Sequence, residues 1–75
     1  MTEGQGLRER KKRERRRRIE EAAIGLFESR GFDGTTVEDI ALAADIAPRT
    51  FFHHFPTKED VVLADYSARL ERIVD

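Results

Sequence analysis

The stretch TVEDIALAADIAPRTFFHHFPTK, from Thr36 to Lys58, has the pattern of two short helices joined by a tight turn. Thr36 can cap the first helix, and Asp39 three residues later completes a near capping box. Residues 45–47 form the turn, where Asp45 can end the first helix because Asp tolerates the left-handed conformation better than most residues do. Pro48 suits the first position of the next helix because its missing N–H needs no partner there. The first helix has an apolar face at i, i+3, i+4 and i+7, formed by Val37, Ile40, Ala41 and Ala44.

The second of these helices is only two turns long and ends near residue 54, because a proline follows at position 56. Phe51 and Phe55 are four residues apart and are expected to point inward together. Arg49, Phe52 and His53 then fall at i, i+3 and i+4 on the outer face. An exposed Phe is uncommon, so a third core aromatic is an equally good interpretation of Phe52.

This outer face has the chemistry of a DNA-reading surface. The second helix of a helix-turn-helix can lie in the major groove, where an arginine offers a fork of donors to a guanine edge or a phosphate. Phe52 could contact a thymine methyl, while His53 could reach a base or a phosphate. Each candidate also has a structural interpretation, since a threonine can be only a cap, and a lysine or histidine only a solvated surface residue. The candidate DNA-binding residues are Thr36, Pro48, Arg49, Thr50, Phe52, His53, His54 and Lys58, together with Arg17 and Arg18.

Helices are also predicted on both sides of this unit. Gly31 can take the left-handed position that closes a first helix, and Phe32 can pack back onto its last turn. Thr57 and Asp60 predict the start of a fourth helix, whose pattern still runs at Asp75 and is expected to be cut there. The first helix has an apolar stripe at Ile19, Ala22, Ala23, Leu26 and Phe27. The apolar side of the fourth is marked by Val62, Leu63, Tyr66, Leu70 and Ile73.

The N-terminal segment is strongly basic. Nine Lys or Arg residues and three Glu residues precede position 19, although the whole chain has a net charge of only −1. Like charges at helical spacing repel, so residues 1–17 are expected to form a flexible arm that frays unless an anion neutralises it. Such an arm could follow DNA phosphates or the minor groove, bind RNA without specificity, or simply be solvated.

The composition bounds the remaining functions. Seventy-five residues allow one small domain, and without cysteine no disulfide can stabilise it. No motif for catalysis or for a cofactor is present, and adjacent histidines point about 100° apart on a helix, which makes a shared metal ion difficult. We therefore expect neither an enzyme nor a metal or cofactor site. No apolar run is long enough for a signal peptide or membrane span, which predicts a cytoplasmic protein.

Together these motifs resemble the N-terminal DNA-binding domain of the tetracycline-repressor (TetR) family of transcriptional regulators. The resemblance runs from about Arg18 to Val62 and includes the first-helix stripe, Gly31-Phe32, Thr35-Thr36-Val37, Ile40-Ala41, Ala44, Thr50 to Pro56, and Lys58-Glu59. It implies an all-α fold: a three-helix head with a homeodomain-like helix-turn-helix (18–56), then the start of a fourth helix (57–75). Thr36, Thr50, His53, His54 and Lys58 match positions that contact phosphate or bases.

The resemblance further implies a ligand-responsive repressor that binds a palindromic operator in double-stranded DNA as a homodimer when full length. The small-molecule effector would bind a C-terminal domain absent from this chain. Three positions depart from the family pattern: Phe52 replaces a Tyr, Asp45 replaces the turn Gly, and Ala47 replaces a polar cap. Two other functions stay open, namely a helical protein-interaction module and a non-specific nucleic-acid binder that acts through the basic arm.

Overall fold

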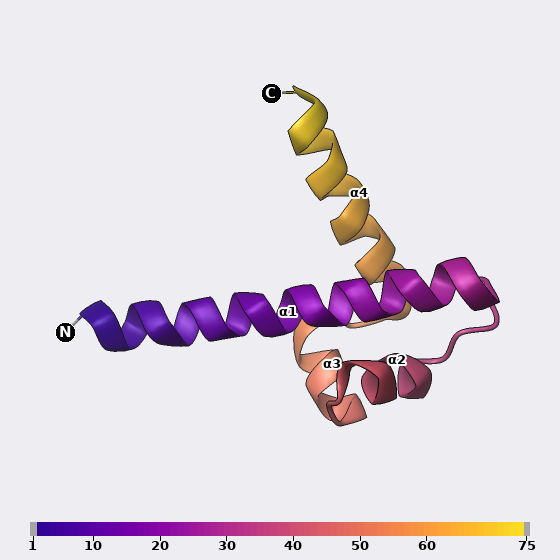
Figure 1. Ribbon diagram of the computed structural model, residues 1–75, viewed down its shortest axis with the longest axis horizontal. Coiled ribbons are helices and arrows are strands. Elements are labelled where there is room, and N and C mark those ends of the chain that lie inside the picture. Colours follow the sequence, from indigo (N-terminus) through magenta and orange to yellow (C-terminus); the bar gives the residue numbers. More distant parts are fainter. Residues whose placement is uncertain (1, 75) are drawn as a thin grey trace.

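The computed structural model of the chain describes residues 2–74, and the side chains of residues 6–71. Within that range the chain forms four helices and no strand: α1 (Thr2–Arg30), α2 (Val37–Ala44), α3 (Pro48–His54) and α4 (Lys58–Val74). Figure 1 shows α2 and α3 gathered beside the C-terminal half of α1, with α4 leading away from them. The predicted all-α fold with a helix-turn-helix is confirmed.

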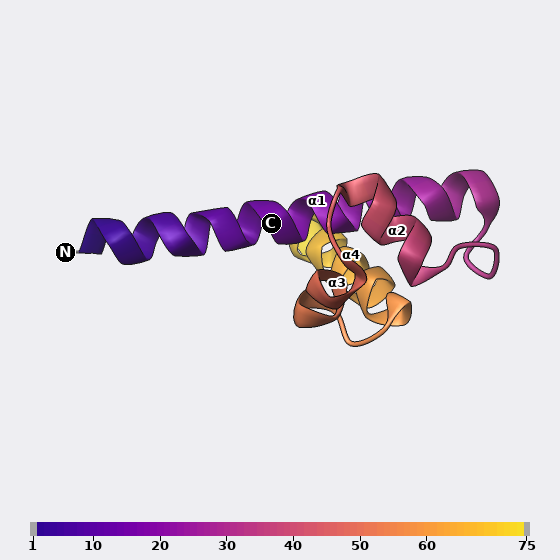
Figure 2. The ribbon, with the colours of Figure 1, turned by 90° about the horizontal axis from the view of Figure 1, so that it is seen from below.

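Helix α1 extends much further toward the N-terminus than the sequence predicted. The expected flexible arm is helical from Thr2 onward, and Met1 is the one residue of the arm that lies outside the described range of 2–74. Arg, Lys and Glu favour helix, and ion pairs at i, i+4 spacing offset part of the repulsion between the cations, at Arg16–Glu20 and Arg17–Glu21. The first turns of this rod extend beyond the other helices in both views (Figures 1 and 2).

The link from α1 to α2 is a compact turn that depends on two glycines. Gly31 has φ 86° and donates its N–H to the Phe27 carbonyl at 2.8 Å, which closes α1 as predicted. Phe32 then packs on Phe27, with ring centroids 4.9 Å apart. A Cβ at Gly34 would lie 2.7 Å from the Arg30 carbonyl oxygen, so a larger residue would force the turn to open.

Helix α2 has both of the expected end structures. The Asp39 N–H donates to Thr36 Oγ1 at 3.0 Å, and the Thr36 N–H donates to Asp39 Oδ2 at 3.1 Å, which forms a capping box. At the other end Asp45 adopts the left-handed conformation, with φ 61° and ψ 47°. The core face of α2 is formed by Ile40, Ala41 and Ala44.

Helix α3 is held by its two inward phenylalanines. Phe51 and Phe55 are fully buried, with centroids 5.7 Å apart, in one core cluster with Ile19, Ala23 and Val61. As expected, Ala47 provides no side-chain cap, so the helix starts on Pro48 without that hydrogen bond. Burying a Phe stabilises a fold by roughly 1.5–3 kcal/mol, so these two rings fix the rotation of α3 about its axis.

Helix α4 starts as predicted but buries a different face. The Asp60 N–H donates to Thr57 Oγ1 at 3.3 Å, while the Thr57 N–H and hydroxyl both donate to Asp60 Oδ2. Val61 is the α4 residue buried in the core, with Ala64 packed beside it. The apolar side that the sequence predicted is not the one that meets the core: its described members are 40–61% exposed, namely Val62, Leu63, Tyr66 and Leu70. The side chain of Ile73 lies outside the described residues.

Candidate nucleic-acid interface

The outer face of α3 is an exposed surface on a fixed helix. Pro48, Arg49 and His53 are exposed, and Phe52 is 51% exposed although one edge of its ring meets Phe51. Phe52 is therefore not a core aromatic, which settles the ambiguity in its sequence pattern. Arg49, Phe52 and His53, at i, i+3 and i+4, share one face of α3. This arrangement is expected from the inward position of Phe51 and Phe55.

The two remaining polar residues of α3 lie toward α1. Thr50 and His54 are half-buried, and with His53 they line a cleft of about 440 Å³ between α3 and the N-terminal half of α1. The pKa of His54 lies below its ordinary value, first because of burial and then because of the nearby cations of α1 and His53. His54 is therefore neutral near pH 7 and can donate one hydrogen bond and accept another.

Arg16 connects α1 to the end of α3. Its guanidinium lies 4.4 Å from the centre of the Phe55 ring and donates to the His54 carbonyl at 3.3 Å. A cation is favourable at this end of a helix, where carbonyl groups are left without intrahelical partners. The same side chain pairs with Glu20 at 3.5 Å, so Arg16 fixes the approach of α1 to α3.

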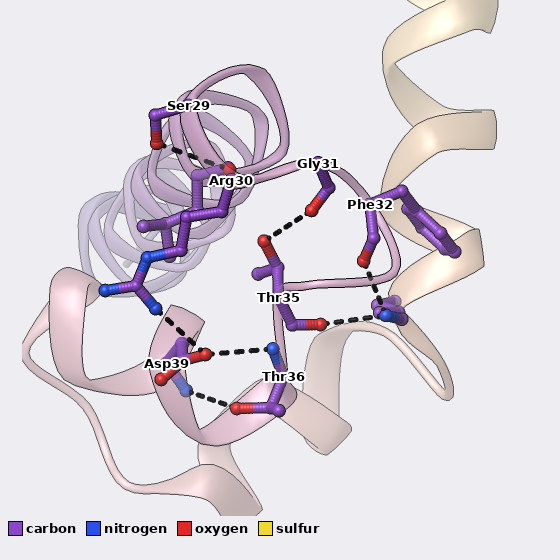
Figure 3. A network of polar contacts seen from close by, with 9 residues as sticks. Ser29, Arg30, Gly31, Phe32, Thr35, Thr36 and Asp39 are labelled. Atoms are coloured by element: carbon purple, nitrogen blue, oxygen red, sulfur yellow. Dashed lines mark hydrogen bonds and ion pairs between the residues drawn. The ribbon is translucent and has the colours of Figure 1, made fainter.

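The cap of α2 is held in a polar network beside the turn. Figure 3 shows Arg30 reaching Asp39, with Nη1 and Oδ2 3.2 Å apart, and Asp39 in turn bonded to Thr36. The hydrogen bonds from Thr36, followed by the charge of Arg30, lower the pKa of Asp39. The cap is thus structural, and the exposed Thr36 hydroxyl still has its own proton to donate.

Lys58 is turned toward the protein rather than toward solvent. Its Nζ donates to the carbonyls of Phe32 and Thr35 at 2.7 and 2.8 Å, oxygens that are visible in Figure 3. It also lies 4.3 Å from the centre of the Phe32 ring. Lys58 is therefore neither freely solvated nor free to contact a phosphate in this conformation.

The two arginines predicted as DNA-binding residues ahead of Ile19 do not line the α3 cleft. Arg17 and Arg18 are exposed and line a hollow that also contains Glu14 and Glu21, with Arg17 paired to Glu21 at 3.8 Å. The arm residues that line the α3 cleft were missed, although their helical spacing of i, i+3, i+4 and i+7 could have identified them. They are Arg8, Lys11, Lys12 and Arg15.

Residues 2–74 contain no helix that is both long and apolar enough to cross a membrane. Among the described residues no cluster of His, Asp or Glu side chains could hold a metal ion. An apolar groove of about 650 Å³ lies between α1 and α4, lined in part by Ile24, Phe27, Val62 and Leu63. The basic side chains lie mainly in the N-terminal half of α1, away from this groove.

Comparison of the sequence with known proteins identifies the family of the chain. Residues 19–64 match the model of the bacterial regulatory proteins of the tetR family. The chain is 49% identical over 65 residues to the HTH-type transcriptional regulator TcmR of Streptomyces glaucescens, which covers 87% of this chain and 29% of TcmR. It is 39% identical over 44 residues to the biofilm operon icaADBC HTH-type negative transcriptional regulator IcaR of Staphylococcus aureus, covering 59% of this chain and 24% of IcaR.

The chain spans less than a third of the length of these curated relatives. No solved structure gives a significant match. The matched region contains the whole of α2 and α3 and begins at Ile19, the first buried residue among residues 6–30 of α1. The chain therefore belongs to the tetR family of bacterial regulatory proteins and contains the N-terminal DNA-binding domain of a transcriptional regulator.

Proposed function

We propose that the chain reads a specific operator by placing α3 in the major groove of double-stranded DNA. The observation that supports this most directly is the division of α3 into a buried face and an exposed one. Phe51 and Phe55 anchor the buried face, while Arg49, Phe52 and His53 are presented together on the other. A rigidly held helix loses little entropy when it binds, so these side chains can discriminate between bases.

The candidate residues take different parts in this proposal. Arg49 binds a guanine edge or a phosphate, Phe52 contacts a thymine methyl, and His53 reaches a base or phosphate. Pro48 and Thr36 approach the backbone at the starts of α3 and α2, where free N–H groups favour phosphate. Because Lys58 is bound to two carbonyls, its contribution is to position the start of α4.

In the full-length protein the operator would be palindromic and bound by a homodimer, because a two-fold dimer presents two identical heads. The protein would be a cytoplasmic repressor. A small-molecule effector would bind in a C-terminal domain beyond residues 57–75 and control the spacing of the heads. The name of IcaR, a negative transcriptional regulator, supports repression as the mode of action.

Selection from a pool of random duplexes, followed by fluorescence anisotropy, tests this proposal. The selected duplex should bind more tightly than a shuffled duplex of the same composition. Arg49→Ala should weaken that binding by about five- to 150-fold, equivalent to the roughly 1–3 kcal/mol of one bidentate base contact. Arg69→Ala is the matched control, because Arg69 pairs with Asp65 on α4.

A non-specific binder that acts through the basic arm predicts a different result. Selection would then enrich no sequence, Arg49→Ala would bind as the unchanged chain does, and deletion of residues 7–17 would remove all affinity. A helical protein-interaction module predicts no salt-dependent DNA binding at all. Either result would contradict the reading of DNA by α3.

A further inference from the structure

The cleft between α1 and α3 is lined by cations and by groups that can donate hydrogen bonds. Its α1 wall consists of four basic side chains, and its α3 wall of Thr50, His53 and His54. No acidic residue lines it, whereas Glu14 and Glu21 line the neighbouring hollow on α1, which shares Lys11 and Arg15 with the cleft. A cleft of this composition is suited to an anion rather than to an apolar or cationic ligand.

We propose that this cleft binds the backbone phosphates of duplex DNA, with Arg8, Lys11, Lys12 and Arg15 holding the strand beside the segment that α3 reads. The proposal rests on the proposed function, because it supposes that α3 lies on DNA. It adds four residues on the extension of α1, which lie outside residues 19–64 that match the family.

The core of the protein fixes the direction in which these cations point. In an α-helix, residues three, four and seven apart lie on the same side. The side of α1 that buries Ile19 and Ala23 continues through Arg16, which touches α3, to the four basic residues further toward the N-terminus. Arg10 and Arg13 lie on the opposite side of the helix, by the same periodicity.

The length of the basic stripe also suits a polyanion. Arg8 and Arg15 are separated by about 10 Å along the helix axis, at 1.5 Å per residue. A DNA strand carries one phosphate per roughly 3.4 Å of duplex axis, so the stripe can accompany a strand over two or three phosphates. Bound phosphates would also neutralise the like charges on this side of α1.

His54 provides a local readout of an anion in the cleft. Burial and then the charges of Arg15, Arg16, Lys12 and His53 lower its pKa in the free protein. A phosphate held between these groups would oppose the cations and favour the protonated ring. Duplex binding should therefore raise the pKa of His54, as measured by NMR of the imidazole ring.

The experiment compares two charge-matched double variants of the 75-residue chain. Lys12→Gln with Arg15→Gln removes two cations from the cleft, and Arg10→Gln with Arg13→Gln removes two from the opposite side. All four side chains are exposed, so both variants should keep the circular dichroism spectrum of the original chain. Binding to a random-sequence duplex is measured by anisotropy at several salt concentrations, so no operator is needed.

The cleft variant should bind about ten- to thirtyfold more weakly near physiological salt. Its plot of log K against log salt should lose about 1.8 of its slope, since each phosphate contact contributes roughly 0.9. The opposite-side variant should lose less than a third of that slope. The rise in the pKa of His54 with DNA should vanish only in the cleft variant.

Equal losses in the two variants, or an unchanged pKa of His54, would overturn the cleft as a phosphate site while DNA binding itself stood. A cleft-specific loss without any operator selection would support this site and contradict sequence-specific reading. No binding to duplex DNA would overturn both the site and the proposed function.

Discussion

Replacing Lys58 with methionine should destabilise the fold rather than only weaken DNA binding. Methionine keeps the apolar part of the side chain but removes the ammonium group that bridges the carbonyls of Phe32 and Thr35. These oxygens belong to the α1–α2 turn, 26 and 23 residues earlier in the chain. The side chain is thus a cross-link between the turn and the start of α4.

The structure sets the size of the effect. A hydrogen bond to a charged group contributes about 1.5–3 kcal/mol, and a partly exposed cation over an aromatic ring adds about 0.5–1 kcal/mol. Because Lys58 is only half-buried, water can replace part of the lost bonding in the variant. The expected loss of unfolding free energy in Lys58→Met is therefore about 2 kcal/mol.

Urea denaturation followed by circular dichroism measures this change. With a slope near 1 kcal/mol per molar urea for so small a domain, the midpoint should fall by about 2 M. Lys11→Met is the matched control, since Lys11 is exposed, and it should change stability by less than about 0.5 kcal/mol. An unchanged midpoint in the Lys58 variant together with weaker DNA binding would refute the structural role and restore Lys58 as a phosphate contact.

Three further predictions concern the turn, the α1–α3 contact and pH. Asp45→Gly should raise the unfolding free energy by up to about 1 kcal/mol in urea titrations, since glycine adopts φ 61° without a Cβ penalty. Arg16→Met should lower it by about 1–2 kcal/mol, and Arg17→Met, which breaks only an exposed pair, by less than about 0.5 kcal/mol. Because the pKa of His54 is depressed, the unfolded chain binds more protons below pH 6.5, so thermal stability should fall there. His54→Gln should reduce that fall more than His53→Gln does.

Local patterns in the sequence predicted most of the fold. The capping box at Thr36, the left-handed Asp45 and the inward pair Phe51 and Phe55 each depend on residues close together in the chain. Such features follow from backbone geometry and side-chain spacing, and all of them are present. The extent of α1 was the exception, because composition favoured a helix while repulsion between like charges argued against one.

Long-range contacts could not be predicted from periodicity. Nothing in the sequence shows that Arg16 meets a carbonyl 38 residues later, or that Lys58 turns back to Phe32. Likewise, two adjacent faces of α4 are apolar, and spacing alone does not say which one meets the core. The choice of Val61 follows from how α4 crosses α1, which is a property of the assembled helices.

The candidate site divides in the same way. The outward position of Arg49, Phe52 and His53 followed from the inward phenylalanines and is confirmed as geometry, while their contacts with DNA stay predictions. The sequence predicted that the arm is basic, but it did not predict which cations would face α3, because the side chains of a flexible segment have no fixed orientation. Because the segment is helical, the side of α1 on which each cation lies is fixed relative to the core.

Helix α1 runs without a break from the basic segment into the core, so the number of residues in it matters as much as their identity. One alanine inserted between Arg17 and Arg18 would leave every cation present and the core untouched, yet it would rotate the N-terminal half by about 100° relative to α3. A four-residue insertion would nearly restore the angle but shift the charges outward by about 6 Å. The length of the segment ahead of Ile19 therefore sets both the direction and the distance of its cations relative to α3, and an insertion there would change both without removing a charge.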